Sequence, residues 1–85
     1  MHFIERYDLL VKIARYIREE NTGTSEELAK KCDIAHADMV HDHVDILREF
    51  TQREGAEIHY DHIRKTYYFI PRGKFTNFKF VKDVE

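Results

Sequence analysis

The sequence predicts one small α+β domain over residues 1–85, mostly helical, with three helices followed by a β-hairpin. Apolar residues recur every three or four positions up to about residue 52, and after Gly55 they alternate every second position. A chain of 85 residues is long enough for one modest core. Its 42% hydrophobic and 13% aromatic content is typical of a folded chain, although 35% of the residues are charged.

The first helix is predicted over about residues 3–20. The residues that share its apolar face are Phe3, Tyr7, Leu10, Ala14 and Ile17, which keep the helical three-and-four spacing. The segment NTGT then interrupts the pattern, and Gly23 is the expected stop.

A short second helix is predicted over about residues 25–32. Thr24 and Glu27 have the spacing of a capping box, in which each side chain bonds the other residue's backbone N–H. Leu28, Ala29 and Cys32 are expected to point inward. A turn at CDIA leads into a longer third helix over about residues 36–52.

The period of two after Gly55 predicts a hairpin over residues 56–70. Ile58 and Tyr60 are expected to face Tyr67 and Phe69 across a polar turn around residues 61–65.

Residues 74–85 form either an extra strand or a tail. The segment FTNFKFVK predicts one short strand at 75–81, with Phe78 and Phe80 on one face and Lys79 on the other. Phe75, Phe78 and Phe80 then form either a face for a partner or dimer, or a cover for the domain's own core. Self-pairing of this edge strand would give a homodimer.

Three segments resemble a winged helix-turn-helix. TGTSEELAKKCDI is similar to the helix-turn-helix entry, VDILREF to the end of the recognition helix, and GAEIHYDHIRKTYYF to the wing hairpin. The resemblance covers about residues 4–70. It is closest to the N-terminal domain of sugar-responsive bacterial repressors and their small free-standing bacterial relatives. It implies a DNA-binding module of transcription regulation, with the third helix in the major groove and the wing on the flanking backbone.

The chain departs from this family at three places. Asp33 stands in a turn that usually bears glycine, and aspartate is expected to adopt the left-handed conformation there, although less readily than glycine. TQRE at 51–54 adds about one helical turn before the wing. AHADMVHDH occupies the start of the third helix, where the family normally has Ser, Thr, Arg or Tyr.

The third helix is expected to show a stripe of four carboxylates on the face that would enter a DNA groove. Asp38, Asp42, Asp45 and Glu49 follow one another at helical spacing, opposite the apolar side. The whole predicted face comprises His36, Asp38, His41, Asp42, Asp45, Arg48 and Glu49. Its charge argues against conventional groove binding, because phosphates repel carboxylates and the Arg or Asn base contacts are missing.

The formal net charge of −2 is distributed unevenly along the sequence. Residues 62–82 carry six Lys or Arg and no acid, whereas residues 1–61 hold eight basic and 14 acidic residues. A basic wing and tail predict backbone contacts with duplex DNA through His62, Arg64, Lys65, Arg72, Lys74 and Lys79. The alternative is a protein-interaction module that has lost DNA binding and meets a basic partner.

The sequence contains no nucleophile motif and no phosphate-binding glycine loop, so we do not expect an enzyme. No cofactor is expected either. His41 with Asp38 and Asp45 could place metal ligands on one face, but a solvated helix surface is the expected interpretation. One cysteine excludes an internal disulfide, which together with the charged start MHFIERYDLL favours a cytoplasmic protein. No apolar run is long enough for a membrane span.

Overall fold

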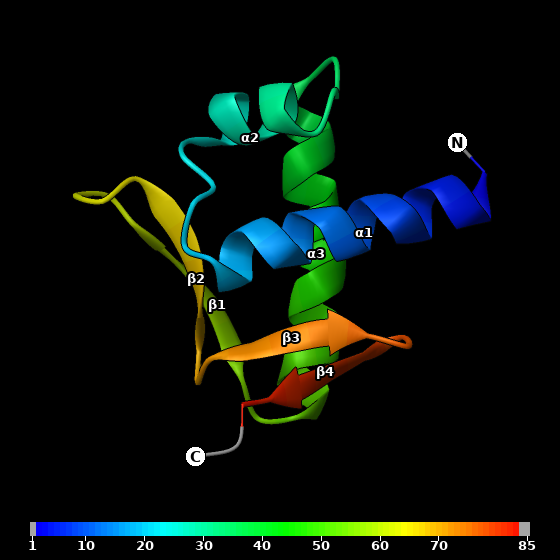
Figure 1. The fold of residues 1–85 in the computed structure, drawn as a ribbon, viewed down its shortest axis with the longest axis vertical. Helices are drawn as coiled ribbons and strands as arrows, with labels where there is room; N and C mark the ends of the chain where they lie inside the picture. The colour runs from blue at the N-terminus through cyan, green and yellow to red at the C-terminus, as the bar shows by residue number, and fades with distance from the viewer. Residues whose placement is uncertain (1, 84–85) are drawn as a thin grey trace.

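The computed structural model describes residues 2–83 and contains three helices followed by two β-hairpins (Figure 1). The elements are α1 (Phe3–Arg18), α2 (Ser25–Lys31), α3 (Ala37–Arg53), β1 (Glu57–Asp61), β2 (Thr66–Ile70), β3 (Gly73–Thr76) and β4 (Lys79–Lys82). The small α+β fold with three helices is therefore confirmed. The last two residues of the predicted tail at 74–85, and Met1, lie outside the described residues.

Each helix ends in the same backbone motif, with a left-handed residue just past its end. Glu20, Asp33 and Gly55 have φ of 54°, 56° and 71°. The closing bonds run from Asn21 N to Tyr16 O (3.1 Å), Ile34 N to Ala29 O (2.8 Å) and Ala56 N to Thr51 O (2.9 Å). These bonds satisfy carbonyls that a helix end would otherwise leave free.

The predicted stop of the first helix at Gly23 was wrong, because α1 already ends at Arg18. Glu20 takes the left-handed conformation that usually favours glycine. The expectation that Asp33 can replace glycine in the turn after α2 is confirmed by its φ of 56°.

The capping box at the start of α2 is confirmed. Glu27 N donates to Thr24 Oγ1 at 3.2 Å, and Thr24 N donates to Glu27 Oε1 at 3.3 Å. The hydrogen bonds from Thr24 stabilise the ionised carboxylate, so the pKa of Glu27 lies below its ordinary value.

The core lies between α1, α2, α3 and the two hairpins. Ile13 and Ile17 of α1, Leu28 of α2 and Leu47 of α3 are fully buried. The second hairpin, β3–β4, closes the lower end of the molecule in front of α3 (Figure 1). Cys32 is also buried, and burial raises the pKa of its thiol.

The first hairpin, β1–β2, has the predicted register. Ile58 pairs with Phe69 and Tyr60 with Tyr67, and the turn occupies residues 62–65. Ile58 and Phe69 are buried, so one face of this hairpin packs on the core while the other faces solvent.

The single extra strand predicted at 75–81 was wrong, because a turn divides this segment into β3 and β4. Asn77 and Phe78 both have positive φ, 52° and 59°, and Thr76 pairs with Lys79. Two successive left-handed residues are the geometry of a type I′ hairpin turn. Phe78 therefore does not share a strand face with Phe80.

Phe75 and Phe80 cannot form the predicted partner or dimer face, because both are buried in the core of this chain. They pair across the second hairpin, with Phe75 5% and Phe80 1% exposed. The ring of Phe75 packs against Phe50, with centroids 5.0 Å apart, and Phe80 packs against Phe69 at 4.9 Å. Only Phe78 of the three reaches solvent, with 50% of its surface exposed.

Two buried threonines join the loop after α1 to β2. Thr22 N donates to Thr66 Oγ1 at 3.1 Å, and Tyr67 N donates to Thr22 Oγ1 at 2.9 Å. The two hydroxyl oxygens lie 3.2 Å apart, and Thr66 Oγ1 also donates to Tyr67 O. The network fixes the position of the first hairpin against the helices.

No helix within residues 2–83 has both the length and the apolar character needed to cross a membrane.

We expect Thr66→Val to lower the free energy of unfolding by about 1–3 kcal/mol, because Thr22 N–H would stay buried without its acceptor. Urea denaturation monitored by circular dichroism measures the change. Thr76→Val is the matched control, since Thr76 is only half-buried and makes no side-chain hydrogen bond to the described residues. Equal stability of the Thr66 variant and the original protein would contradict the assigned role of this network.

Candidate functional site

The four predicted carboxylates of α3 form one exposed face, which we call the acidic face: Asp38, Asp42, Asp45 and Glu49. Helical geometry places them opposite Val40, Val44 and Leu47, which are buried. Arg48 Nη1 lies 3.1 Å from Asp45 Oδ1, and this is the only ion pair that the described residues make with the face. His36 and His41 are exposed at its N-terminal end.

His41 is held by a chain of hydrogen bonds that joins three elements. Its Nε2 lies 2.8 Å from Ser25 Oγ of α2, and Ser25 Oγ lies 2.9 Å from the Tyr67 hydroxyl of β2. His43 is buried, and its Nδ1 lies 2.7 Å from Met39 O, as expected for a histidine on the apolar side of α3.

A shallow hollow of about 410 Å³ separates α3 from the first hairpin. Its lining comes from the start of α2, from α3 and from both hairpin strands: Thr24, Ser25, Glu26, Arg48, Tyr60, His62 and Tyr67. The acidic helix and the first hairpin therefore border one concave surface.

Arg64, predicted to contact phosphates, is neutralised within the chain. Its Nε donates to Asp61 Oδ2 at 2.8 Å and its Nη1 to Glu20 Oε1 at 2.6 Å. These bonds raise the pKa of Arg64, and the same arginine, together with the N–H groups of Ile63 and Arg64, lowers the pKa of Asp61 to about 2. Two carboxylates therefore offset the positive charge that this guanidinium would offer to an anion.

The other predicted basic residues are divided among separate places. His62 and Lys65 are exposed in the turn of the first hairpin, next to Ile63. Arg72 donates to Arg18 O at 3.3 Å and its Nε lies 3.7 Å from Glu20 Oε2. Lys74 and Lys79 lie on the solvent face of the second hairpin, opposite Phe75 and Phe80. The structure does not bring the six predicted residues into one surface.

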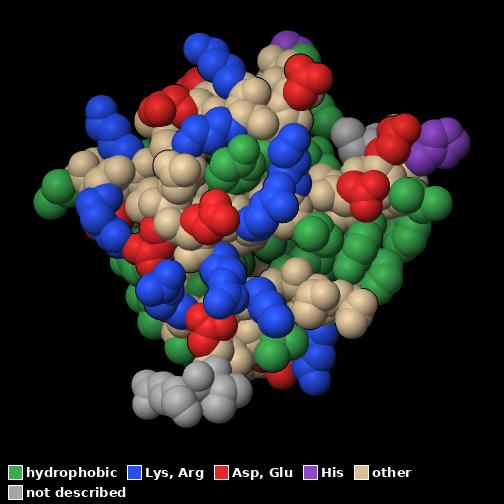
Figure 2. Space-filling model, viewed as in Figure 1, with side chains coloured by type: hydrophobic (Ala, Val, Ile, Leu, Met, Phe, Trp, Pro, Cys, Tyr) green, Lys and Arg blue, Asp and Glu red, His purple; other side chains and the backbone are tan. Residues whose placement is uncertain are grey.

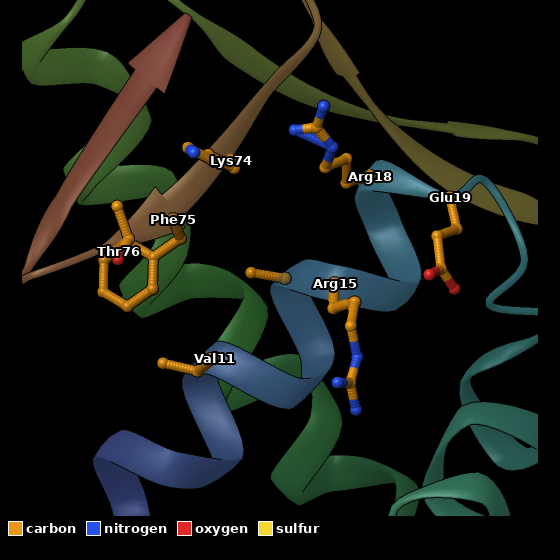
Figure 3. Close-up of a pocket in the computed structure, with 8 residues that line it drawn as sticks. Val11, Arg15, Arg18, Glu19, Lys74, Phe75 and Thr76 are labelled. Atoms are coloured by element: carbon orange, nitrogen blue, oxygen red, sulfur yellow. The ribbon is translucent and has the colours of Figure 1, made fainter. Parts of the chain in front are cut away.

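A further region with basic residues lies over α1 and β3, and it combines the predicted Lys74 with Arg15 and Arg18, which the sequence did not predict. Figure 2 shows Lys and Arg side chains scattered over this face with carboxylates between them. A hollow of about 480 Å³ is lined here by Arg15, Arg18, Glu19 and Lys74 above apolar residues. In Figure 3, Arg15 and Glu19 point away from Lys74. Arg18 pairs with Asp83, with Nη1 3.2 Å from Oδ1. These cations do not converge on one point.

An aromatic cluster, also missed from the sequence, lies between the start of α1 and the turn of the second hairpin. The Phe78 ring lies 4.2 Å from that of Tyr7 and 5.8 Å from that of Phe3, measured between centroids. These residues border what we call the aromatic hollow, about 180 Å³ in volume, lined by Phe3, Arg6, Tyr7, Leu10, Ile46, Phe50 and Phe78. The helical spacing predicts Phe3 on the apolar face of the first helix, but its side chain is 70% exposed.

Within residues 2–83, no three His, Cys, Asp or Glu side chains are arranged to hold a metal ion. Comparisons of the chain with protein-family models, with curated proteins and with solved structures give no match.

The low pKa of Asp61 predicts an acid-dependent hairpin. A carboxylate whose pKa falls from 3.8 to about 2 on folding stabilises the fold above pH 4 and loses this contribution as the pH falls towards 2. We expect the amide NMR shifts of Ile63 and Arg64, which donate to Asp61 Oδ1, to titrate in this range. In Asp61→Asn the titration should be absent and stability at neutral pH reduced. Unchanged titration of both amides in this variant would exclude Asp61 as its source.

Proposed function

We propose that this chain is a winged-helix-type module that binds a basic protein partner through the acidic face of α3. The observation that carries the proposal is the pairing of charges on the folded chain. The four carboxylates of the acidic face are exposed and only Asp45 of them is paired, with Arg48, whereas Arg64 of the first hairpin is already bonded to Asp61 and Glu20. The order of helices and the first hairpin support the winged-helix assignment, with α2 and α3 in the helix-turn-helix positions.

Electrostatic magnitudes favour a cationic partner over duplex DNA. A carboxylate held about 7 Å from a phosphate costs about 0.6 kcal/mol even in bulk water, and more where water is excluded. Three carboxylates of the face, Asp38, Asp42 and Glu49, have no ion-pair partner among the described residues that would offset this repulsion. The same charges attract lysine and arginine side chains and accelerate association with them.

The proposal is tested with a fluorescent lysine–alanine helical peptide as the basic probe and a random duplex DNA as the competing ligand. We expect the full chain to bind the peptide more tightly than the duplex at low salt, with weaker binding at about 0.15 M salt because screening reduces the attraction. Asp42→Asn with Glu49→Gln should weaken peptide binding, because both substitutions remove charge from the face.

Glu5→Gln with Asp8→Asn serves as the control for this experiment, because it also removes two charges and both residues are exposed on α1, outside the acidic face. Duplex binding without peptide binding would overturn the proposal.

Duplex DNA binding led by the first hairpin is the second candidate. The exposed His62 and Lys65 at the turn of this hairpin favour it, because a wing tip contacts the sugar–phosphate backbone. Its affinity would be nonspecific and would fall steeply with salt.

This second candidate predicts that Glu20→Gln increases duplex affinity, because it frees Arg64 and Arg72 from a carboxylate. The slope of log K against log salt should steepen by about 0.9 for each added phosphate contact. Fluorescence anisotropy at several salt concentrations measures both quantities. Glu5→Gln on α1 changes the net charge equally, away from the hairpin, so an equal gain in both variants would argue against hairpin-led binding.

A further inference from the structure

The aromatic hollow presents apolar surface that the core does not use. Phe3 is 70%, Ile4 72% and Phe78 50% exposed, and all three lie around the start of α1. Among the described residues, only three other large hydrophobic side chains are exposed. Ile63 lies at the other end of the molecule, and Ile70 and Val81 are about half-exposed. Contiguous exposed apolar surface of this kind marks interaction sites, whereas single exposed residues do not.

Phe78 occupies a backbone position that disfavours it. Its φ of 59° in a two-residue turn is easiest for glycine or asparagine. A large aromatic side chain here carries a conformational cost, and stacking on Tyr7 and Phe3 leaves half of it in solvent. The ring extends one wall of the hollow outward from the molecule.

The hollow and the acidic face share one helix. Ile46 and Phe50 line the hollow. Asp42 lies four residues before Ile46 and Glu49 three residues after it, so these carboxylates are its neighbours on the helix surface. Arg6 is the one charged residue in the lining. The apolar surface is therefore bordered along α3 by negative charge.

The apolar hollow and its acidic border together determine which kind of partner could bind here. A two-fold contact between copies of this chain places the same surface on both sides, so the acidic faces would approach one another. A partner segment with apolar side chains on one face and lysine or arginine beside them meets both features at once. An amphipathic helix has this pattern and commonly places its apolar anchors in a groove.

We propose that the aromatic hollow is the anchor site for a basic amphipathic helix of a partner protein, which inserts an apolar side chain between Phe3, Ile46 and Phe78. Its cations then lie against Asp42 and Glu49. This inference rests on the proposed function and specifies the partner segment that the acidic face would bind.

The test compares two labelled helical peptides of equal length and lysine content, one with leucine and one with alanine at the apolar positions. We expect the full chain to bind the lysine–leucine peptide about tenfold more tightly than the lysine–alanine peptide. Phe78→Asn should remove most of this difference without changing the affinity for the lysine–alanine peptide. Asparagine suits the left-handed turn, so this variant keeps the hairpin while it loses the ring.

Ile63→Asn is the control, because it removes an exposed hydrophobic residue of the first hairpin that does not line the hollow. Circular dichroism of each variant verifies the fold. Equal affinity for the two peptides, or full retention of leucine selectivity in Phe78→Asn, would overturn the anchor site and leave the acidic-face proposal standing. Failure of both peptides to bind would overturn both proposals.

Discussion

The buried link between Thr22 and Thr66 is the contact on which the arrangement of this molecule depends. It joins residues 44 positions apart, between the loop after α1 and the start of β2. Without it the first hairpin would attach to the helices mainly through Ile58, Tyr67 and Phe69. Because burial removes competing water, each hydroxyl and amide in the network must find its partner within the protein. The concave surface between α3 and the hairpin has its shape because this link holds one side of it.

Glu20, in the loop after α1, forms ion pairs that change the charge available on the first hairpin. It follows the last residues of α1 in a left-handed conformation, and its carboxylate reaches Arg64 of the first hairpin and Arg72 after it. A residue just past the end of a helix thereby offsets the charge of Arg64 and Arg72, whereas Lys65 in the hairpin turn stays exposed. The basic character of residues 62–82 is therefore weaker in the folded protein than in the sequence. Within residues 2–83, only Asp45 of the four carboxylates on the acidic face has an ion-pair partner, Arg48.

The sequence predicted those elements that depend on local chemistry. Apolar spacing located the three helices, the Thr24–Glu27 pair defined the start of α2, and Asp33 took the left-handed turn expected of it. The second hairpin was missed because its turn, Asn77–Phe78, lacks the glycine that usually marks this geometry. The stacking of Phe78 on Tyr7 and Phe3, residues distant in sequence, accompanies that turn. No local sequence pattern predicts these contacts between residues far apart in the chain.

By itself the sequence determined the order of helices and first hairpin and the alignment of four carboxylates on α3, because helical periodicity alone puts Asp38, Asp42, Asp45 and Glu49 on one side. Only the tertiary structure decided which charges remain free and which aromatic residues are exposed. Arg64 is paired with carboxylates from two segments, Phe75 and Phe80 are buried in the core, and Phe78 stays exposed. The physical reason is that ion pairing and burial depend on neighbours from distant parts of the chain.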